Sequence, residues 1–243
     1  YINEENEDNR YEAQIRRLRL RFDGFVWNPK FIYIIQLSFA PGDVGQVQEG
    51  DNVNIIRDAA FYYRPNKNWN FIFGQTKLPG NRQRVNSSGA LQLTDRTINN
   101  ARFTIDRDFG FQAYYLNEKE DAFSYNVKTA VSTGEGRNWT QTSDDGVALT
   151  GKLEIMPFGA FKNNGIYFEG DIAREKKPKL MFSGAFQQNN SAVRTNGQLG
   201  NLLYEPRTLK SYFADVMFKY NGWAFMSAYM QREASELVTY NPD

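Results

Sequence analysis

Residues 16–23 read Arg-Arg-Leu-Arg-Leu-Arg-Phe-Asp and carry the side chains of this chain best suited to bind an ion. Successive side chains of a β-strand point to opposite faces, so Arg17, Arg19 and Arg21 would share one face. At the usual strand rise, their guanidinium groups would be spaced about 7 Å apart. Facing bulk solvent they would only repel one another, whereas facing a water-filled lumen they would form a path for anions.

Two interpretations of this arginine face stay open. In the first, each guanidinium group replaces part of the hydration shell of a passing anion and holds it weakly enough to release it. In the second, the arginines pair with acidic residues of neighbouring strands, such as Asp58 or Glu154, and stiffen the wall. Two interpretations also stay open for three lysines with lumen-facing parity, Lys128, Lys152 and Lys219. They would form a basic patch that attracts anions, or they would be scattered, solvated side chains on a wet wall.

The composition excludes several classes of function. The 243 residues include no Cys and no His, which removes the usual ligands of metal sites and the commonest general base. We therefore expect no metal, no cofactor and no catalytic residue. The formal net charge of +1 is too small for a typical nucleic-acid binder, so we expect no nucleic-acid partner. Any preference for anions must come from the positions of the charges.

Alternation of apolar and polar residues predicts roughly ten strands of about ten residues each. The expected strands cover residues 12–26, 31–39, 55–64, 69–76, 109–115, 123–132, 147–155, 180–187, 212–220 and 223–232. Residues 160–178 are ambiguous, with 167–172 as a short strand or a packed loop. No apolar run reaches the roughly 18 residues that a transmembrane helix requires.

The connections between these strands alternate in length. Those at 27–30, 65–68, 117–121 and 221–222 are short, and those at 41–54, 79–106, 134–145 and 189–209 are long. The connection at 157–178 is the exception, because it is long where a short one is expected. Short turns at one end and long loops at the other are typical of an outer-membrane β-barrel. The alternative is a soluble β-sandwich that binds carbohydrate through loop tryptophans, since such folds also alternate apolar and polar faces.

Two further groups of residues fit a barrel. Aromatic residues gather near the short turns, as in an interfacial girdle, and these are Trp27, Trp69, Tyr115, Phe123 and Trp223. The longest irregular stretch, residues 79–106, is of a length that is usually functional or disordered. It carries four charged residues, Arg82, Arg84, Asp95 and Arg96.

Six stretches taken together, in this order and spacing, resemble the phosphate-selective porin O and P family of bacterial outer membranes. They are Arg-Arg-Leu-Arg-Leu at 16–20, Arg-Asp-Ala-Ala-Phe-Tyr-Tyr-Arg at 57–64, Phe-Gly-Gln-Thr-Lys-Leu-Pro at 73–79, Arg-Asp-Phe-Gly-Phe at 107–111, Gly-Lys-Leu-Glu-Ile-Met-Pro-Phe-Gly at 151–159 and Lys-Tyr-Asn-Gly at 219–222. The resemblance covers nearly the whole chain.

This resemblance implies an all-β fold, a transmembrane antiparallel up-and-down β-barrel of about 16 strands, usually a homotrimer in contact with outer-membrane lipid. Residues 1–243 would form a single barrel domain that is incomplete at both ends. Residues 79–106 would be the third external loop, which folds inward and narrows the pore, and Arg17 would lie nearer the outside than Arg21. The charged residues of that loop, Arg82, Arg84, Asp95 and Arg96, would be constriction residues that either select solutes at the narrowest point or pin the loop to the wall. The implied function is passive, anion-favouring diffusion of small solutes such as phosphate.

Overall fold

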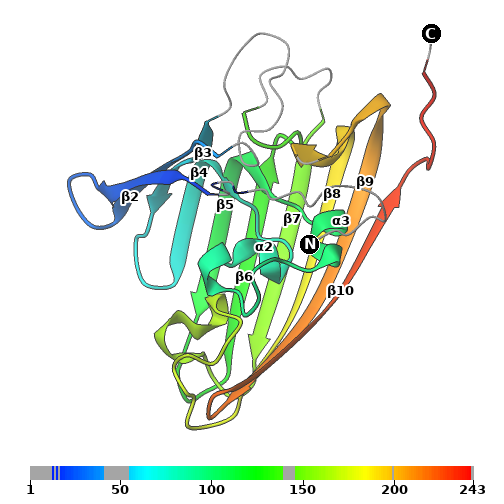
Figure 1. Cartoon of the computed structure of the whole chain (residues 1–243). Coiled ribbons are helices and arrows are strands. Elements are labelled where there is room, and N and C mark those ends of the chain that lie inside the picture. The colour runs from blue at the N-terminus through cyan, green and yellow to red at the C-terminus, as the bar shows by residue number, and fades with distance from the viewer. Residues whose placement is uncertain are drawn as a thin grey trace.

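The computed structural model describes residues 13, 15, 17–40, 55–138, 146–198 and 200–241. It contains ten strands in one sheet (Figure 1). They are β1 (Arg19–Phe25), β2 (Phe31–Ser38), β3 (Ile56–Tyr63), β4 (Trp69–Lys77), β5 (Arg107–Asn117), β6 (Ser124–Ser132), β7 (Ala148–Met156), β8 (Lys179–Gln198), β9 (Leu202–Tyr220) and β10 (Trp223–Ala234).

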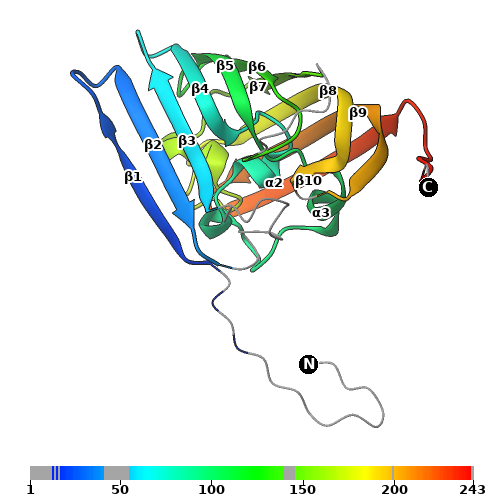
Figure 2. The same ribbon diagram turned by 90° about the horizontal axis from the view of Figure 1, so that it is seen from above.

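The sheet has a simple up-and-down topology. Each strand pairs antiparallel with the next in sequence, and β1 and β10 form the two edges. Viewed from above, the sheet curves around a concave side that holds two short helices, α2 (Arg82–Val85) and α3 (Ile98–Phe103) (Figure 2). The predicted fold class is confirmed, because this is the strand arrangement of a β-barrel wall. A sandwich would need two packed sheets, and the described residues form a single one.

The sheet exposes its apolar side chains and buries its charged ones, which is the reverse of the arrangement in a soluble protein. A row of apolar side chains runs across five adjacent strands on the convex face, and it consists of Phe61, Phe73, Phe111, Val131 and Leu149. All five are exposed. The largest fully buried side chains include Arg82, Lys179, Lys219, Gln112 and Glu154. Exposed apolar rows of this extent mark a surface that contacts something other than water.

Three residues of the predicted aromatic girdle, Trp69, Tyr115 and Phe123, take part in a chain of ring contacts from β4 to the start of β6. Trp69 stacks on Phe71 at 5.5 Å between ring centroids and meets Tyr115 edge-on at 5.2 Å. Tyr115 lies 6.0 Å from Tyr125, which in turn lies 6.2 Å from Phe123. Trp27 and Trp223 are among the most exposed apolar side chains that the structure describes.

Two segments fold over the concave face. Each packs against the wall through a hydrophobic cluster. Loop 79–106 contains α2, the short 3₁₀ helix η1 (Ser88–Ala90) and α3. Leu78 and Ile105, at its two ends, pack with Ala130, Ala185 and Phe213 of the wall. Segment 157–178 contains the 3₁₀ helix η2 (Lys162–Tyr167). Its Phe161 and Ile166 pack in a second cluster of three wall methionines, Met156, Met181 and Met217. No helix in the described residues is both long and apolar enough to cross a membrane.

One expectation about the connections is wrong. Residues 189–209 were expected to form a loop, but β8 extends to Gln198 and β9 begins at Leu202, so most of this stretch is paired strand. The polar run 187–191 hides the strand pattern, and the register shifts between Asn189 and Arg194. Of the two structures left open for residues 167–172, the strand is absent, since Tyr167 ends η2 and residues 168–172 follow it as loop. All of the predicted loop 41–54 and residues 139–145 of the predicted loop 134–145 lie outside the described residues, as does Arg16.

Candidate functional site

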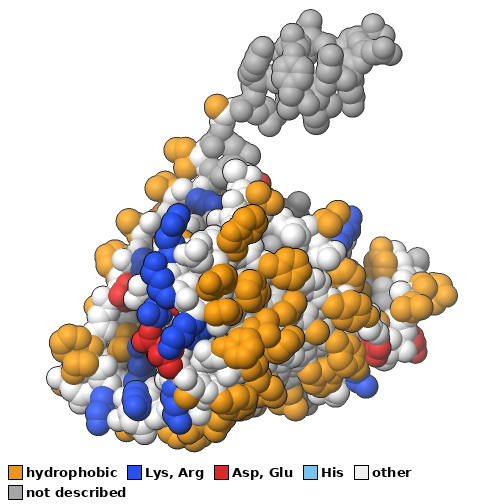
Figure 3. Space-filling model, turned by 90° about the horizontal axis from the view of Figure 1, so that it is seen from below, with side chains coloured by type: hydrophobic (Ala, Val, Ile, Leu, Met, Phe, Trp, Pro, Cys, Tyr) orange, Lys and Arg blue, Asp and Glu red, His pale blue; other side chains and the backbone are white. Residues whose placement is uncertain are grey.

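A cavity of about 620 Å³ lies on the concave side, between the wall, loop 79–106 and segment 157–178. Among its described lining residues, eleven are basic and three are acidic. The basic ones are Arg19, Arg21, Arg57, Arg64, Lys67, Lys77, Arg84, Arg96, Arg107, Lys128 and Lys152, and the acidic ones are Asp58, Glu118 and Glu154. Figure 3, the view from below, shows a line of Lys and Arg side chains beside a broad hydrophobic surface. The near-neutral chain therefore concentrates positive charge at this cavity.

The three arginines predicted to share one face have different surroundings. Two of them are in β1 and line the cavity, whereas Arg17, just before β1, lies beside loop 79–106. Arg19 and Arg21 line the cavity, as their strand parity predicts, and Arg21 Nε donates to Asp23 at 2.8 Å. Arg17 Nη2 lies 3.9 Å from Asp95 Oδ1 of the loop. The two acids named as wall partners in the alternative interpretation bind other cations, since Asp58 pairs with Arg107 and Glu154 with Arg82.

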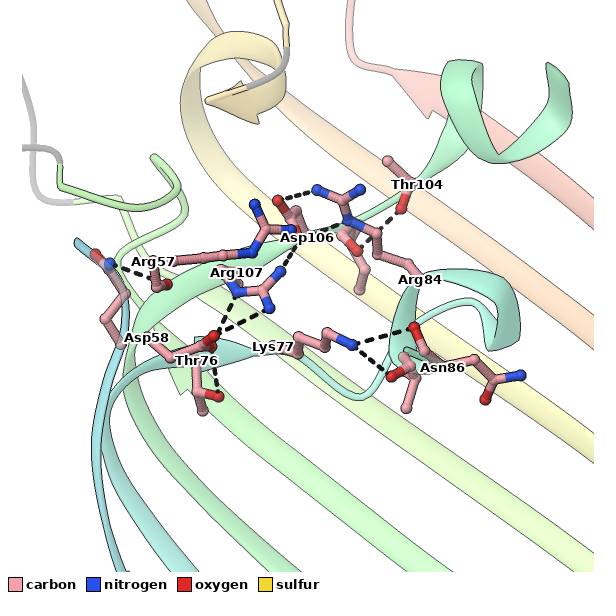
Figure 4. Close-up of polar contacts among 12 residues, drawn as sticks. Arg57, Asp58, Thr76, Lys77, Arg84, Asn86, Thr104, Asp106 and Arg107 are labelled. Carbon is pink, nitrogen blue, oxygen red and sulfur yellow. Dashed lines mark hydrogen bonds and ion pairs between the residues drawn. The ribbon is translucent and has the colours of Figure 1, made fainter. Parts of the chain in front are cut away.

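A cluster of charges joins β3, β5 and the end of loop 79–106 (Figure 4). Arg107 binds Asp58 through two nitrogens, with Nε–Oδ1 at 2.9 Å and Nη2–Oδ2 at 3.0 Å, and its Nη1 lies 3.1 Å from Asp106 Oδ1. Arg84 Nε donates to the same Asp106 oxygen at 2.6 Å. Although burial favours the neutral acid, Arg84 and Arg107 hold the pKa of Asp106 below its ordinary value. This carboxylate therefore fastens the loop to the wall.

Arg82 is a brace of loop 79–106 and lies away from the cavity lining. Its Nη2 donates to Glu154 Oε1 of β7 at 2.5 Å, and its Nε lies 3.4 Å from Asp215 Oδ1 of β9. Burial disfavours the guanidinium cation, but Glu154 and Asp215 together raise the pKa of Arg82 above its ordinary value. Of the two interpretations of the loop charges, the geometry of Arg82 fits pinning to the wall.

Arg84 and Arg96 are the loop arginines that line the cavity. Arg96 donates to the carbonyl oxygens of Gln83 at 2.6 Å and Asn86 at 3.0 Å. Burial, followed by repulsion from Arg84 and Arg17, lowers the pKa of Arg96 to about 10. Arg96 is still a cation at neutral pH, and the direction of its shift reflects a positively charged neighbourhood.

Lys128 and Lys152 lie directly opposite each other on β6 and β7 and would repel without an acid between them. Glu154 supplies it, with Oε2 at 2.8 Å from Lys128 Nζ and Oε1 at 3.7 Å from Lys152 Nζ. Lys152 also donates to the carbonyl oxygen of Gly80 at 2.8 Å. Both lysines line the cavity, so they are partly neutralised there rather than solvated.

A family model described as phosphate-selective porin O and P matches residues 1–236 of the 243 residues. The chain belongs to this family. No curated protein matches it. No solved structure does either. Porins of this family reside in the bacterial outer membrane and act as channels rather than as enzymes. Within the part of the porin that the structure describes, no group of acidic, His or Cys side chains could hold a metal ion.

In this porin Lys219 is separated from the other two candidate lysines. Its Nζ donates to three carbonyl oxygens of segment 157–178, those of Gly165 at 2.7 Å, Phe168 at 2.8 Å and Gly170 at 2.8 Å. The three lysines therefore do not form one patch, because segment 157–178 covers Lys219 before it can face the large cavity.

Five basic residues of the porin's cavity were not among the sequence candidates, and they are Arg57, Arg64, Lys67, Lys77 and Arg107. Strand parity counted from the outward-facing Phe61, Phe73 and Phe111 assigns Arg57, Lys77 and Arg107 to the outer face. The alternation fails near the strand ends. In β4 it stops at Gly74, which has φ of 117°, and Gln75 and Thr76 after it are both buried. A glycine inside a strand pattern is the signal that could have revealed this change.

Proposed function

We propose that this porin allows passive, anion-favouring diffusion of small solutes such as phosphate through a water-filled lumen, of which the cavity is a part. The observation that supports this function is the excess of basic over acidic residues in the cavity lining. A passage lined by one sign of charge with low-dielectric walls raises the local concentration of the opposite ion. Guanidinium and ammonium groups spaced along the wall would replace hydration without holding the anion tightly.

The residues proposed to face the anion fall into two sets. Arg19 and Arg21 form a step on the wall, and Arg84 and Arg96 form a step on the loop. Arg82 and Asp95 act indirectly in this proposal, because they hold the loop beside the path. The outward apolar rows would contact outer-membrane lipid. The homotrimer that the family resemblance implies is the proposed assembly.

The double variant Arg19→Ala/Arg21→Ala tests the proposal in a planar bilayer with a potassium chloride gradient. We expect the reversal potential to shift toward that of a less anion-selective channel, because two cations leave the path. The matched control is Lys30→Ala/Lys210→Ala, which removes the same charge from two exposed side chains outside the cavity lining and outside segment 157–178. Because salt screens charges in open solvent, the control should leave the potential unchanged.

An unchanged reversal potential in the arginine variant would reject the role of these two residues. A wild-type channel that favours potassium over chloride would reject the anion preference itself. Adding phosphate to both sides of the chloride-conducting channel extends the test to the solute. Competition for the same path should reduce the chloride current, and an additive current would exclude phosphate as a favoured solute.

A further inference from the structure

Segment 157–178 joins β7 to β8 at the end of the sheet where the other connections are short turns. Instead of turning back at once, it folds over the concave face (Figure 1). Phe161 and Ile166 pack into the methionine cluster of the wall. Lys219 donates to three of its backbone carbonyls, and Lys179 Nζ donates to a fourth, that of Phe158, at 3.0 Å. The wall therefore holds this segment by both apolar packing and charged donors.

The segment also binds loop 79–106, which comes from the opposite end of the sheet. Glu169 Oε1 accepts from Gln83 Nε2 at 3.2 Å, and its Oε2 accepts from the backbone amide of Gln92 at 2.9 Å. The backbone amide of Glu169 donates to the carbonyl oxygen of Ala90 at 2.9 Å. Arg82 Nη1 donates to the carbonyl oxygen of Ile166 at 3.3 Å. Glu169 is buried, so this joint is shielded from water.

Two residues of the segment line the same cavity as the basic residues, Asn164 and Tyr167. Lys128 Nζ lies 5.6 Å from the ring centroid of Tyr167 and 5.7 Å from that of Tyr114. Asn163 and Asn164 have φ of 50° and 55°, a conformation that asparagine adopts more readily than most residues. This turn places the half-buried Tyr167 in the cavity lining, with one side packed against the methionine cluster of the wall.

We propose that segment 157–178 is a second constriction element, which meets loop 79–106 and sets the size limit of the channel together with it. Tyr167 faces the path, and Glu169 joins the two elements. This inference rests on the proposed function only in taking the cavity as a route for solutes. It does not depend on which ions the channel prefers.

The absence of cysteine from the chain allows a direct test in the full protein. A Tyr167→Cys variant in a planar bilayer is treated with a sulfonate-bearing methanethiosulfonate reagent. The thiolate attacks the reagent's sulfenyl sulfur, forms a disulfide and releases sulfinate. We expect loss of most of the single-channel current. The matched control is Phe158→Cys, in the same segment but exposed and away from the cavity lining, which should be labelled without loss of current.

A Tyr167→Ala variant supplies a second, independent measurement. Removing the ring should increase the single-channel conductance and let larger neutral sugars enter liposomes in a swelling assay, whereas Phe158→Ala should change neither. Labelling of Tyr167→Cys without loss of current, or unchanged conductance and sugar limit in Tyr167→Ala, would overturn the proposal. A current loss in a channel whose reversal potential shows no anion preference would keep the second constriction and reject the proposed anion selectivity.

Discussion

At the scale of single residues, the most unusual feature is a buried network of five charges on the concave wall. Glu154 contacts three cations, Arg82, Lys128 and Lys152, and Asp215 lies within 3.9 Å of two of them. The side chains of all five are at most 4% exposed. Burying ions is costly unless each finds a partner, so the network depends on its central carboxylate.

Replacing Glu154 with Gln should strongly destabilise the porin. The amide keeps the shape of the side chain but removes the charge that three buried cations share, and Asp215 lies near only two of them, Arg82 and Lys152. Removing one partner of a buried ion pair typically costs about 3–5 kcal/mol, and we expect a loss of that order in the free energy of unfolding. Urea unfolding in detergent, followed by tryptophan fluorescence, would measure it.

The control is Glu120→Gln, which breaks an exposed pair with Lys162 at 2.8 Å. An exposed ion pair contributes about 0–1 kcal/mol, so this variant should unfold nearly as the parent does. Equal losses in the two variants would show that the buried network is not what stabilises the wall.

At the scale of elements, loop 79–106 is fastened at several separate points. Asp106 binds Arg84 and Arg107 near its end. Arg232 of the edge strand β10 donates to the carbonyl oxygens of Phe103 at 2.9 Å and Thr104 at 3.1 Å, where α3 ends. A cation at the last carbonyls of a helix is favourable because these groups lack helical partners. The loop is thus part of the wall rather than a freely moving flap.

Acidification should leave the loop in place over a wide range of pH. The folded pKa of Asp106 is lowered from 3.8, so its contribution to stability is fully present above pH 3.8 and is lost only as the pH falls through the lower folded value. We expect the same open-channel noise at pH 7 and pH 4.5. Asp106→Asn should increase that noise already at pH 7, whereas Asp121→Asn, in an exposed turn pair, should not. Noise that rises in the parent between these pH values would contradict this.

The strands were predictable from the sequence where one face is apolar along its whole length. Phe109, Phe111 and Tyr115 share one face with Ala113, and β5 covers that stretch and extends two residues beyond it at each end. The outer halves of β8 and β9 were not predictable, because Gln188, Asn189 and Asn190 offer no apolar side for a pattern. Backbone pairing with the neighbouring strand, which a single segment does not reveal, decides their structure.

The candidate site was predictable only in part, and for a related reason. Strand parity placed Arg19 and Arg21 on the cavity side. It could not identify the ion partners, since Arg82 reaches Glu154 and Asp215, which are 72 and 133 residues away along the chain. The parity of a strand residue predicts which face of the sheet its side chain is on. The ion pairs of a loop residue depend instead on how far the loop folds across that face.

At the scale of the whole molecule, the apolar face points outward and the charges point inward. A central outward position such as Phe111 should not tolerate a charge. In a membrane barrel, Arg on the lipid face costs about 2–4 kcal/mol near the midplane and about 0–1 kcal/mol near the interfaces. We therefore expect Phe111→Arg to be far more destabilising than Phe123→Arg, which lies in the aromatic girdle.

Gel mobility without and with prior heating gives the measurement. The folded porin in detergent should migrate faster than the heated chain, and Phe111→Arg should lose the fast band at a lower temperature than Phe123→Arg. Full-length protein that is monomeric and soluble without detergent would contradict a lipid-facing outer surface.

The Arg82 brace has a consequence for the order of assembly. It joins a loop between β4 and β5 to a carboxylate on β9, so it cannot form until β9 has joined the sheet. Closing so long a stretch of chain is entropically costly and belongs late in folding. The contacts of Asp106 with Arg84 and Arg107 need only β5 and the loop itself, so they can form early. The loop is therefore anchored at one end first, and its Arg82 end is fixed only after β9 is in place.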